Sequence, residues 1–180
     1  MNEFSKEIKE ISGENFNLCY QCKKCTAGCP TAEFMEIKPN EIIRHIQYGN
    51  KDILLKSEAI WLCVACETCG ERCPNDIKIS KLAAALRRKA IEEQVEIADK
   101  IGYSFNTSFV ESIKKYGRVH EATFLISYKM KTKDFFSEAA LNDMKTGIKL
   151  FMRGKLPLFP KKIKDLKTIK KIFEKNAPEI

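Results

Sequence analysis

Two copies of one cysteine motif, placed 44 residues apart, constrain this chain more than any other feature of its sequence. Each copy has the spacing C-x2-C-x2-C-x3-C and is followed directly by a proline. Together they contain all eight cysteines: Cys19, Cys22, Cys25 and Cys29 in the first copy, and Cys63, Cys66, Cys69 and Cys73 in the second. A repeat of this kind predicts two similar units that each contribute half of a shared structure.

The spacing within each motif is typical of ligands for a [4Fe–4S] cluster. Three cysteines at two-residue gaps let a tight loop bind three corners of one cube, with main-chain N–H groups turned toward the sulfurs. The fourth cysteine follows a longer gap and, in the bacterial ferredoxin arrangement, binds the other cluster. We therefore predict two [4Fe–4S] clusters, one bound by Cys19, Cys22, Cys25 and Cys73, and the other by Cys63, Cys66, Cys69 and Cys29.

A structural zinc site and inert buried thiols are the alternatives to clusters. Zinc sites usually combine two separated C-x2-C pairs, without an evenly spaced third cysteine or a trailing proline. Disulfides are disfavoured, because the first ten residues are charged throughout and lack the apolar region of a secretory signal. Thiols stay reduced in the cytosol, so we expect a cytoplasmic protein whose cysteines bind metal.

Charge is concentrated at one end of the 180-residue chain. Residues 1–144 carry 21 basic and 21 acidic side chains, whereas residues 145–175 carry 11 basic and two acidic ones, and the net charge is +8. Basicity limited to the tail argues poorly for nucleic-acid binding. The longest uncharged stretch, Ile101 to Val110, is far shorter than the ~20 apolar residues of a transmembrane helix. We therefore expect no membrane span and no nucleic-acid partner.

Helix signals surround the motifs, while strand signals are scarce. Proline near the start and glycine past the end predict a helix over Pro39–Gly49. Ser57 is expected to cap a short helix over Glu58–Leu62. A long helix is expected over Ser80–Gly102, capped by its first residue and ended by its last, and another over Thr107–Tyr116. The predicted fold is all-α, with the cluster-binding loops between helices.

With these features the sequence resembles the α-helical ferredoxin family and, within it, the C subunit of heterodisulfide reductase. The resemblance in fold rests on the two cysteine motifs and the helical segment between them, over residues 15–102. The resemblance to the C subunit rests on three short segments: Trp61-Leu62-Cys63, Lys115-Tyr116-Gly117-Arg118 followed by Glu121, and Arg153-Gly154-Lys155-Leu156-Pro157.

The resemblance implies a role in methanogenic archaea. The C subunit of that family passes electrons from a flavin-containing A subunit to a B subunit, which reduces the coenzyme M–coenzyme B heterodisulfide. In cytosolic assemblies a hydrogenase or a formate dehydrogenase supplies the electrons, and ferredoxin is reduced alongside by flavin-based electron bifurcation. The resemblance therefore implies an iron–sulfur electron-transfer subunit of an oxidoreductase complex in methanogenesis.

The residues themselves indicate no substrate-converting site. The sequence has no G-x-G-x-x-G turn for a dinucleotide, and the two predicted clusters use every cysteine. His45 and His120 stand in no nucleophile–base pattern and are expected to be surface or satisfied core residues. We therefore predict no catalytic residue in this chain, which carries electrons without making or breaking bonds.

Charged and aromatic residues beside the motifs have two interpretations each. Lys23, Lys24 and Arg72 lie inside the loops, where positive charge favours the reduced, more negative cluster. Solvated loop residues are the more common case and the preferred interpretation. Trp61 could shield a cluster from water, but a plain core aromatic is commoner.

We expect three segments along the chain: a ferredoxin core over residues 1–102, a helical continuation over 103–144 and a basic arm over 145–180. In the arm, apolar residues from Ile163 to Phe173 recur at helical spacing between lysines. This stripe could fold back on its own core or dock on another subunit, and docking is the preferred interpretation. The prolines of residues 156–160 predict an extended hinge.

Two other functions fit parts of the sequence. One is the iron–sulfur subunit of another dehydrogenase, of the succinate, fumarate or glycerol-3-phosphate type. The first two carry a plant-type cluster domain ahead of such motifs, which we expect to be absent because 18 residues precede Cys19. The third usually continues into cysteine-rich segments, whereas no cysteine follows Cys73. The other function is a zinc-stabilised nucleic-acid-binding module with a basic tail.

Overall fold

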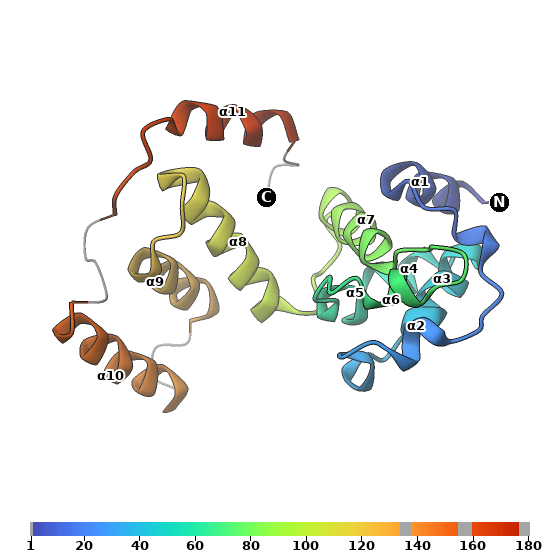
Figure 1. The fold of residues 1–180 in the computed structure, drawn as a ribbon, viewed down its shortest axis with the longest axis horizontal. Coiled ribbons are helices and arrows are strands. Elements are labelled where there is room, and N and C mark those ends of the chain that lie inside the picture. The colour runs from blue at the N-terminus through green and yellow to red at the C-terminus, as the bar shows by residue number, and fades with distance from the viewer. Residues whose placement is uncertain (1, 134–137, 155–159, 177–180) are drawn as a thin grey trace. The chain divides into compact units, whose positions relative to one another are not determined.

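The computed structural model describes residues 2–133, 138–154 and 160–176 (Figure 1). Within these ranges every regular element is an α-helix or a short 3-10 helix, and no β-strand is present. The chain divides into two compact units, Met1–Asp99 and Lys100–Ile180. The prediction of an all-α fold is confirmed, while the division into segments 1–102, 103–144 and 145–180 stays a prediction.

Unit 1 contains seven α-helices and two 3-10 helices among its described residues, and they follow the repeat in the sequence. Both cysteine motifs contain a short helix, α2 in the first and α6 in the second, and these two helices pack against each other. The elements are α1 (Glu3–Ser12), η1 (Phe16–Leu18), α2 (Lys24–Ala27), η2 (Ala32–Phe34), α3 (Pro39–Tyr48), α4 (Lys51–Leu55), α5 (Ala59–Leu62), α6 (Thr68–Arg72) and α7 (Ile79–Glu92).

One hydrophobic core holds unit 1 together and reaches the cysteines. Helix α7 packs against α1, α4 and α5, and α3 packs against α1 and α4. Cys25 belongs to the buried core, and five other cysteines pack against it. The cysteine loops therefore rest on a packed base, which restricts where the sulfur atoms lie. The most completely buried side chains of this core include Ile8, Phe16, Ile42, Ile46, Leu54, Ile60, Leu82 and Leu86.

Helix α3 begins and ends as predicted. Pro39 is its first residue, and Gly49 ends it with a φ of +77°, a left-handed conformation that glycine adopts without steric cost. The helix buries Ile42, Ile43 and Ile46 against the core. The sequence prediction succeeds here because both boundary signals are local to the helix.

Helix α5 begins at Ala59, one residue later than predicted, and Glu58 rather than Ser57 occupies its N-cap position. The Ser57 hydroxyl accepts a hydrogen bond from the Ala59 N–H at 3.0 Å. The Glu36 carboxylate, far away in the sequence, accepts from the N–H groups of Glu58 at 2.6 Å and Ala59 at 3.3 Å. Both acceptors satisfy N–H groups that have no partner within the helix.

Helix α7 differs from its prediction at both ends. Ser80 lies inside the first turn rather than at the cap, and the Glu14 carboxylate accepts from the Lys78 N–H at 3.0 Å instead. The helix ends at Glu92, well before Gly102. The reason is the left-handed conformation of Gln94, with a φ of +54°, which turns the Val95 N–H toward the Ala90 carbonyl at 2.9 Å. The predicted helix over Ser80–Gly102 is therefore wrong in both boundaries.

Unit 2 contains α8 (Lys100–Tyr116), α9 (Glu121–Thr132), α10 (Glu138–Met152) and α11 (Leu166–Asn176) among its described residues. Helices α8 and α9 pack through a cluster of aromatic rings, in which Phe124 meets Phe105 edge-on at 5.0 Å between centroids. Helix α8 ends at Tyr116 before Gly117 as predicted, but it begins at Lys100 rather than Thr107. Gly102 lies inside it, because a glycine costs an α-helix only about 1 kcal/mol relative to alanine.

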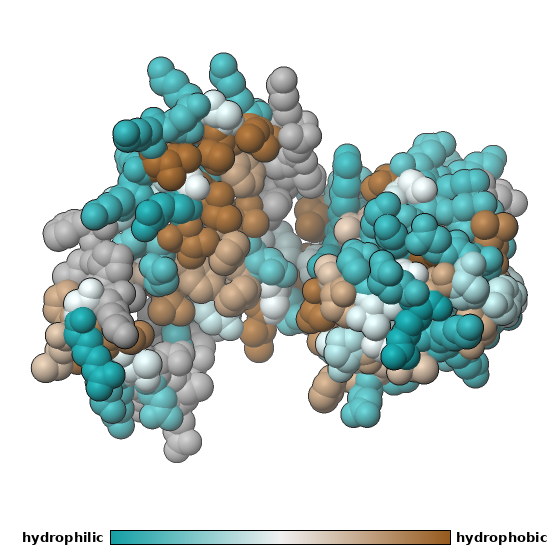
Figure 2. Space-filling view, in the orientation of Figure 1, coloured by the Kyte–Doolittle hydropathy of each residue, from teal (hydrophilic) through white to brown (hydrophobic). Residues whose placement is uncertain are grey.

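Part of the basic arm folds onto its own unit. The Ile163 N–H donates to the Tyr116 carbonyl at 3.1 Å, and α11 packs against α8. Hydrophobic side chains gather over α8 and α11 in Figure 2, whereas the visible face of unit 1 is mainly hydrophilic. Of the predicted hinge, residues 156–159 lie outside the described part of the chain.

No helix among the described residues is long and apolar enough to cross a membrane.

Candidate metal centres

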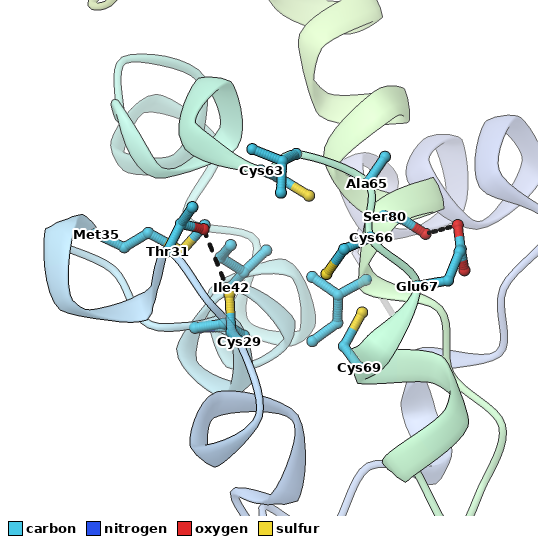
Figure 3. Close-up of a pocket in the computed structure, with 13 residues that line it drawn as sticks. Cys29, Thr31, Met35, Ile42, Cys63, Ala65, Cys66, Glu67, Cys69 and Ser80 are labelled. Atoms are coloured by element: carbon cyan, nitrogen blue, oxygen red, sulfur yellow. Dashed lines mark hydrogen bonds between the residues drawn. The ribbon is translucent and has the colours of Figure 1, made fainter.

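The eight cysteines line two cavities of unit 1, with four thiols at each. Each cavity combines three cysteines of one motif with the last cysteine of the other. In Figure 3 the sulfur atoms of the second cavity point into a common space. The first cavity is lined by Cys19, Cys22, Cys25 and Cys73, and the second by Cys63, Cys66, Cys69 and Cys29.

The backbone takes the same unusual turn in both loops. Gln21 and Lys23 have φ values of 60° and 64°, and their counterparts 44 residues later, Ala65 and Glu67, have 50° and 61°. Left-handed backbone is unfavourable for residues other than glycine. Such turns direct successive N–H groups to one side and form a concave surface that binds anions, including iron–sulfur clusters.

The donor set suits a cluster better than a single ion. Among the described residues, no three His, Cys, Asp or Glu side chains lie close enough together to hold one metal ion. Zinc draws its sulfur ligands to about 2.3 Å, whereas each thiolate around a [4Fe–4S] cube binds a separate iron. Four thiols around a cavity, beside a loop with left-handed turns that suit an anion, fit the larger anionic group.

The thiols differ in how readily they ionise. Burial raises the pKa of Cys25 and of Cys63. In contrast, hydrogen bonding of the Cys66 sulfur with the side chain and the main chain of Thr68 lowers the pKa of Cys66. Metal ligation requires thiolates and releases their protons, so a bound cluster stabilises the ionised form of the buried thiols.

A network of neutral side chains joins the first loop to Asn40 of α3. The Gln21 amide donates to the Asn40 carbonyl at 3.0 Å and to the Cys19 sulfur at 3.4 Å. The Asn40 amide donates back to the Gln21 side-chain oxygen at 3.0 Å, and its own oxygen accepts from the Thr26 hydroxyl at 2.6 Å. Asn40 is only 5% exposed, so this network ties the first loop to the core.

The second loop is held by charged side chains. Arg87 of α7 donates to the carbonyls of Ile60, Trp61 and Cys63. Burial lowers the pKa of the Arg87 guanidinium, and the charge of a Cys63 thiolate opposes that effect. The Glu67 carboxylate, which lines the second cavity, accepts from the Ser80 hydroxyl at 2.7 Å.

Each cavity has one open edge, at the second cysteine of its own motif. Cys22 and Cys66 are exposed, Cys25 is buried and the other five cysteines are half-buried. A large apolar residue precedes each open edge, and both are exposed, Tyr20 at 63% and Val64 at 62%. The two edges are therefore the places where a cluster would come nearest to solvent and to another protein.

The charged and aromatic residues singled out from the sequence lie as follows. Lys23, Lys24 and Arg72 are exposed, in accord with the solvated interpretation, although Lys23 also lines the first cavity. Trp61 is half-buried against the core, and the Arg87 guanidinium lies 5.8 Å from the centre of its ring.

Both histidines are structural. His45 pairs with the Asn50 amide at 2.9 Å, and the buried His120 caps α9 by accepting from the Thr123 N–H. Neither lines a cysteine cavity. The prediction of satisfied core or surface residues is confirmed for both.

Sequence reasoning missed Gln21, Asn40, Glu36 and Arg87. Gln21 lies inside the first motif, but nothing in the spacing assigns a role to a residue between two ligands. Glu36, Asn40 and Arg87 lie outside both motifs. Only tertiary packing brings Asn40 and Arg87 to the loops and Glu36 to the start of α5.

Residues 18–78 match the family described as a 4Fe-4S dicluster domain. The second iron–sulfur C subunit of the CoB–CoM heterodisulfide reductase of Methanocaldococcus jannaschii is 30% identical over 173 residues, covering 93% of this chain and 92% of that protein.

Two shorter alignments agree with this match. The iron–sulfur C subunit of the same reductase from Methanopyrus kandleri is 39% identical over 97 residues, covering 52% of this chain and 50% of the relative. The C subunit of the H2:CoB-CoM heterodisulfide,ferredoxin reductase of Methanothermobacter thermautotrophicus is 36% identical over 88 residues, covering 49% and 48%. In these two alignments the chain spans about half the length of each relative.

Proposed function

Because this chain belongs to the C-subunit family of CoB–CoM heterodisulfide reductases, we propose that it relays electrons inside such a complex. The electrons pass from a flavin-containing A subunit to a B subunit that reduces the coenzyme M–coenzyme B heterodisulfide. The observation that carries the proposal is the grouping of eight thiols into two sets of four, one around each cavity. The chain itself converts no substrate.

Two [4Fe–4S] clusters are the cofactors of this proposal. Cys19, Cys22, Cys25 and Cys73 hold one cluster, and Cys63, Cys66, Cys69 and Cys29 hold the other. The support is that each set lines one cavity, beside a loop whose N–H groups suit an anion. When bound, each cluster accepts and returns one electron.

The protein's part is to keep the two sites together and partly open. Helices α2 and α6 pack against each other, and the last cysteine of each motif lines the cavity of the other. This crossing joins both sites into one rigid body, which favours transfer between them. The exposed Cys22 and Cys66 mark the edges at which electrons arrive and leave.

The partners follow from the same proposal. The flavin-containing A subunit and the catalytic B subunit bind this chain, and a hydrogenase or a formate dehydrogenase supplies electrons to the larger assembly. In the basic arm, residues 145–180, the lysines whose exposure the structure describes offer a docking surface for another subunit, while α11 packs against α8 of its own unit. We place the complex in the cytoplasm, because a reducing compartment keeps thiols available for metal.

Anaerobic purification tests the cofactors. A brown protein with about eight irons per chain, bleached by dithionite, is the expected result for two [4Fe–4S] clusters. Electron paramagnetic resonance of the reduced sample should show cluster signals. A colourless protein that contains zinc would contradict the proposal and favour the zinc-stabilised module.

The relay is tested by reconstitution with the other subunits. The purified A and B subunits should reduce the heterodisulfide only when this chain is added with its clusters. The matched control is the same chain after its iron is removed with a chelator. A rate of heterodisulfide reduction that does not depend on the loaded chain would contradict the relay but not the presence of clusters.

A further inference from the structure

Arg87 contacts the second loop in a way that the electron relay alone does not explain. Its guanidinium donates to three main-chain carbonyls, those of Ile60, Trp61 and Cys63. These carbonyls lie at the end of α5 and at the first residue of the second loop. Arg87 thus binds the main chain at the start of the second loop, including the carbonyl of Cys63, the first cysteine of the motif.

The guanidinium suits the end of a helix. The last carbonyls of α5 have no partner within the helix, and a cation is favoured beside them. Because the guanidinium is planar and presents several donors in a fixed arrangement, it can hold three carbonyls at once. Arg87 therefore limits the positions that Cys63 can take.

The charge of Arg87 is partly removed from water and is bound to the main chain of Cys63, a residue that lines the second cavity. Arginine stays protonated at every ordinary pH, and half-burying a cation is unfavourable without a nearby anion. The anionic groups that act on it are the Cys63 thiolate and, to a smaller extent, the Asp99 carboxylate. An oxidised cluster with four thiolates carries a charge of roughly minus two, and Cys63 lines the second cavity.

The first loop is held without such a charge. The side chains that tie it to α3, those of Gln21, Asn40 and Thr26, are all neutral. Its cations, Lys23 and Lys24, are exposed, so water and salt screen them. A half-buried positive charge therefore acts on one site more strongly than on the other.

We propose that Arg87 is a positioning residue that holds Cys63 and raises the reduction potential of the cluster in the second cavity. The proposal rests on the clusters of the proposed function. One electron takes that cluster from a charge of roughly minus two to minus three with no proton transferred. A nearby fixed cation stabilises the more negative form, so Arg87 makes the second cluster easier to reduce.

The test replaces Arg87 with Met, to remove the charge, and with Lys, to keep it while losing the planar group. Arg88→Met is the matched control, because Arg88 is the next residue, is exposed and pairs with Glu92 at 2.7 Å. Iron content and a redox titration followed by electron paramagnetic resonance are measured for each full chain. Cys22→Ser and Cys66→Ser assign the two signals, since each perturbs one cluster.

In Arg87→Met the second cluster should become harder to reduce, by at least a tenfold change in its reduced-to-oxidised ratio at a fixed potential. For one electron this is about 59 mV. The first cluster should shift less, Arg88→Met should shift neither, and Arg87→Lys should lie nearer to the wild type. Equal shifts of both clusters, or no shift in Arg87→Met, would overturn the proposal.

If Arg87→Met loses iron, the amount of iron lost and the behaviour of Arg87→Lys test the positioning role. Selective loss of about four irons, with retention in Arg87→Lys, supports the positioning role. Loss of all iron in both variants would overturn it. So would a second cluster in Arg87→Lys that is as hard to reduce as a second cluster lacking the positive charge. A wild-type chain without clusters would instead contradict the proposed function, so the two failures are distinguishable.

Discussion

The two cysteine loops share their spacing and their backbone turn, but different side chains hold them in place. Both loops have left-handed residues at the same two positions of the repeat and continue into a short helix, α2 or α6. At one of these positions the first loop has Lys23 and the second has Glu67. Repetition therefore preserves the ligand geometry, while the charge around each site differs.

The supports of the loops differ in the same way. Amides and hydroxyls from α3 and the first loop bind one another in the first site, whereas Arg87 and Ser80 of α7 bind the second. The difference teaches that a duplicated motif specifies two similar sites, and that the surrounding side chains make the two sites unequal. Three predictions test this comparison, from the largest expected effect to the smallest.

The largest effect is expected from exchanging the last cysteine of a motif. Cys73→Ser should remove or alter the cluster of the first cavity, because Cys73 lines that cavity together with the first three cysteines. Cys29→Ser should do the same to the second cluster. Iron content should fall from about eight to about four in either variant. If Cys73→Ser instead damages the signal that Cys66→Ser also perturbs, the crossed ligation is contradicted.

A smaller effect is expected from Asn40→Ala, which removes the centre of the network around the first loop. The change removes the side-chain partner of the Gln21 oxygen and of the Thr26 hydroxyl, although the bonds of both residues to the Asn40 main chain do not need that side chain. We expect a loss of about 2 kcal/mol in unfolding free energy. The first cluster should also lose iron faster in the presence of a chelator. Denaturant unfolding and timed iron release measure the two effects.

Ser80→Ala is the matched variant for the second loop, since the Ser80 hydroxyl donates to Glu67. It should accelerate iron release from the second cluster and not from the first. Equal acceleration of both clusters in either variant would show that the two supports are not independent.

The smallest effect is expected from Glu36→Gln, at the start of α5. Although burial works against ionisation, hydrogen bonds from the Ser57 hydroxyl and from main-chain N–H groups outweigh it and lower the pKa of Glu36. A capping contact of this kind contributes about 1 kcal/mol to the unfolding free energy. Because Glu36 is exposed, the loss in Glu36→Gln should not exceed that value.

The pH dependence has a definite sign. The unfolded chain takes up the Glu36 proton near pH 4.3, above the lowered pKa of the folded state, so the contribution is present at neutral pH and is lost as the pH falls below that value. Urea unfolding should show that the unfolding free energy changes less between pH 7 and pH 4 in Glu36→Gln than in the wild type. The control is Glu33→Gln, an exposed neighbour; an equal change there would contradict the assignment.

Local signals in the sequence predicted the elements whose boundaries depend on their own residues. Proline and glycine placed α3, and Gly117, with a φ of +79°, ended α8. The same reasoning failed at α7, because Gln94 takes a left-handed conformation that is rare for glutamine. It failed at the start of α8, because Gly102 stays inside the helix.

The sequence by itself determined the all-α class and predicted the ligand set, since cysteine spacing and helix periodicity are properties of short segments. The sequence also establishes the family, through its similarity to a reductase C subunit over most of both chains. Only the tertiary structure decided which side chains hold each loop and the start of α5, because Asn40, Glu36 and Arg87 reach their partners across 14 to 27 residues of chain. Such contacts form when helices pack, and no local pattern records which helix faces which loop.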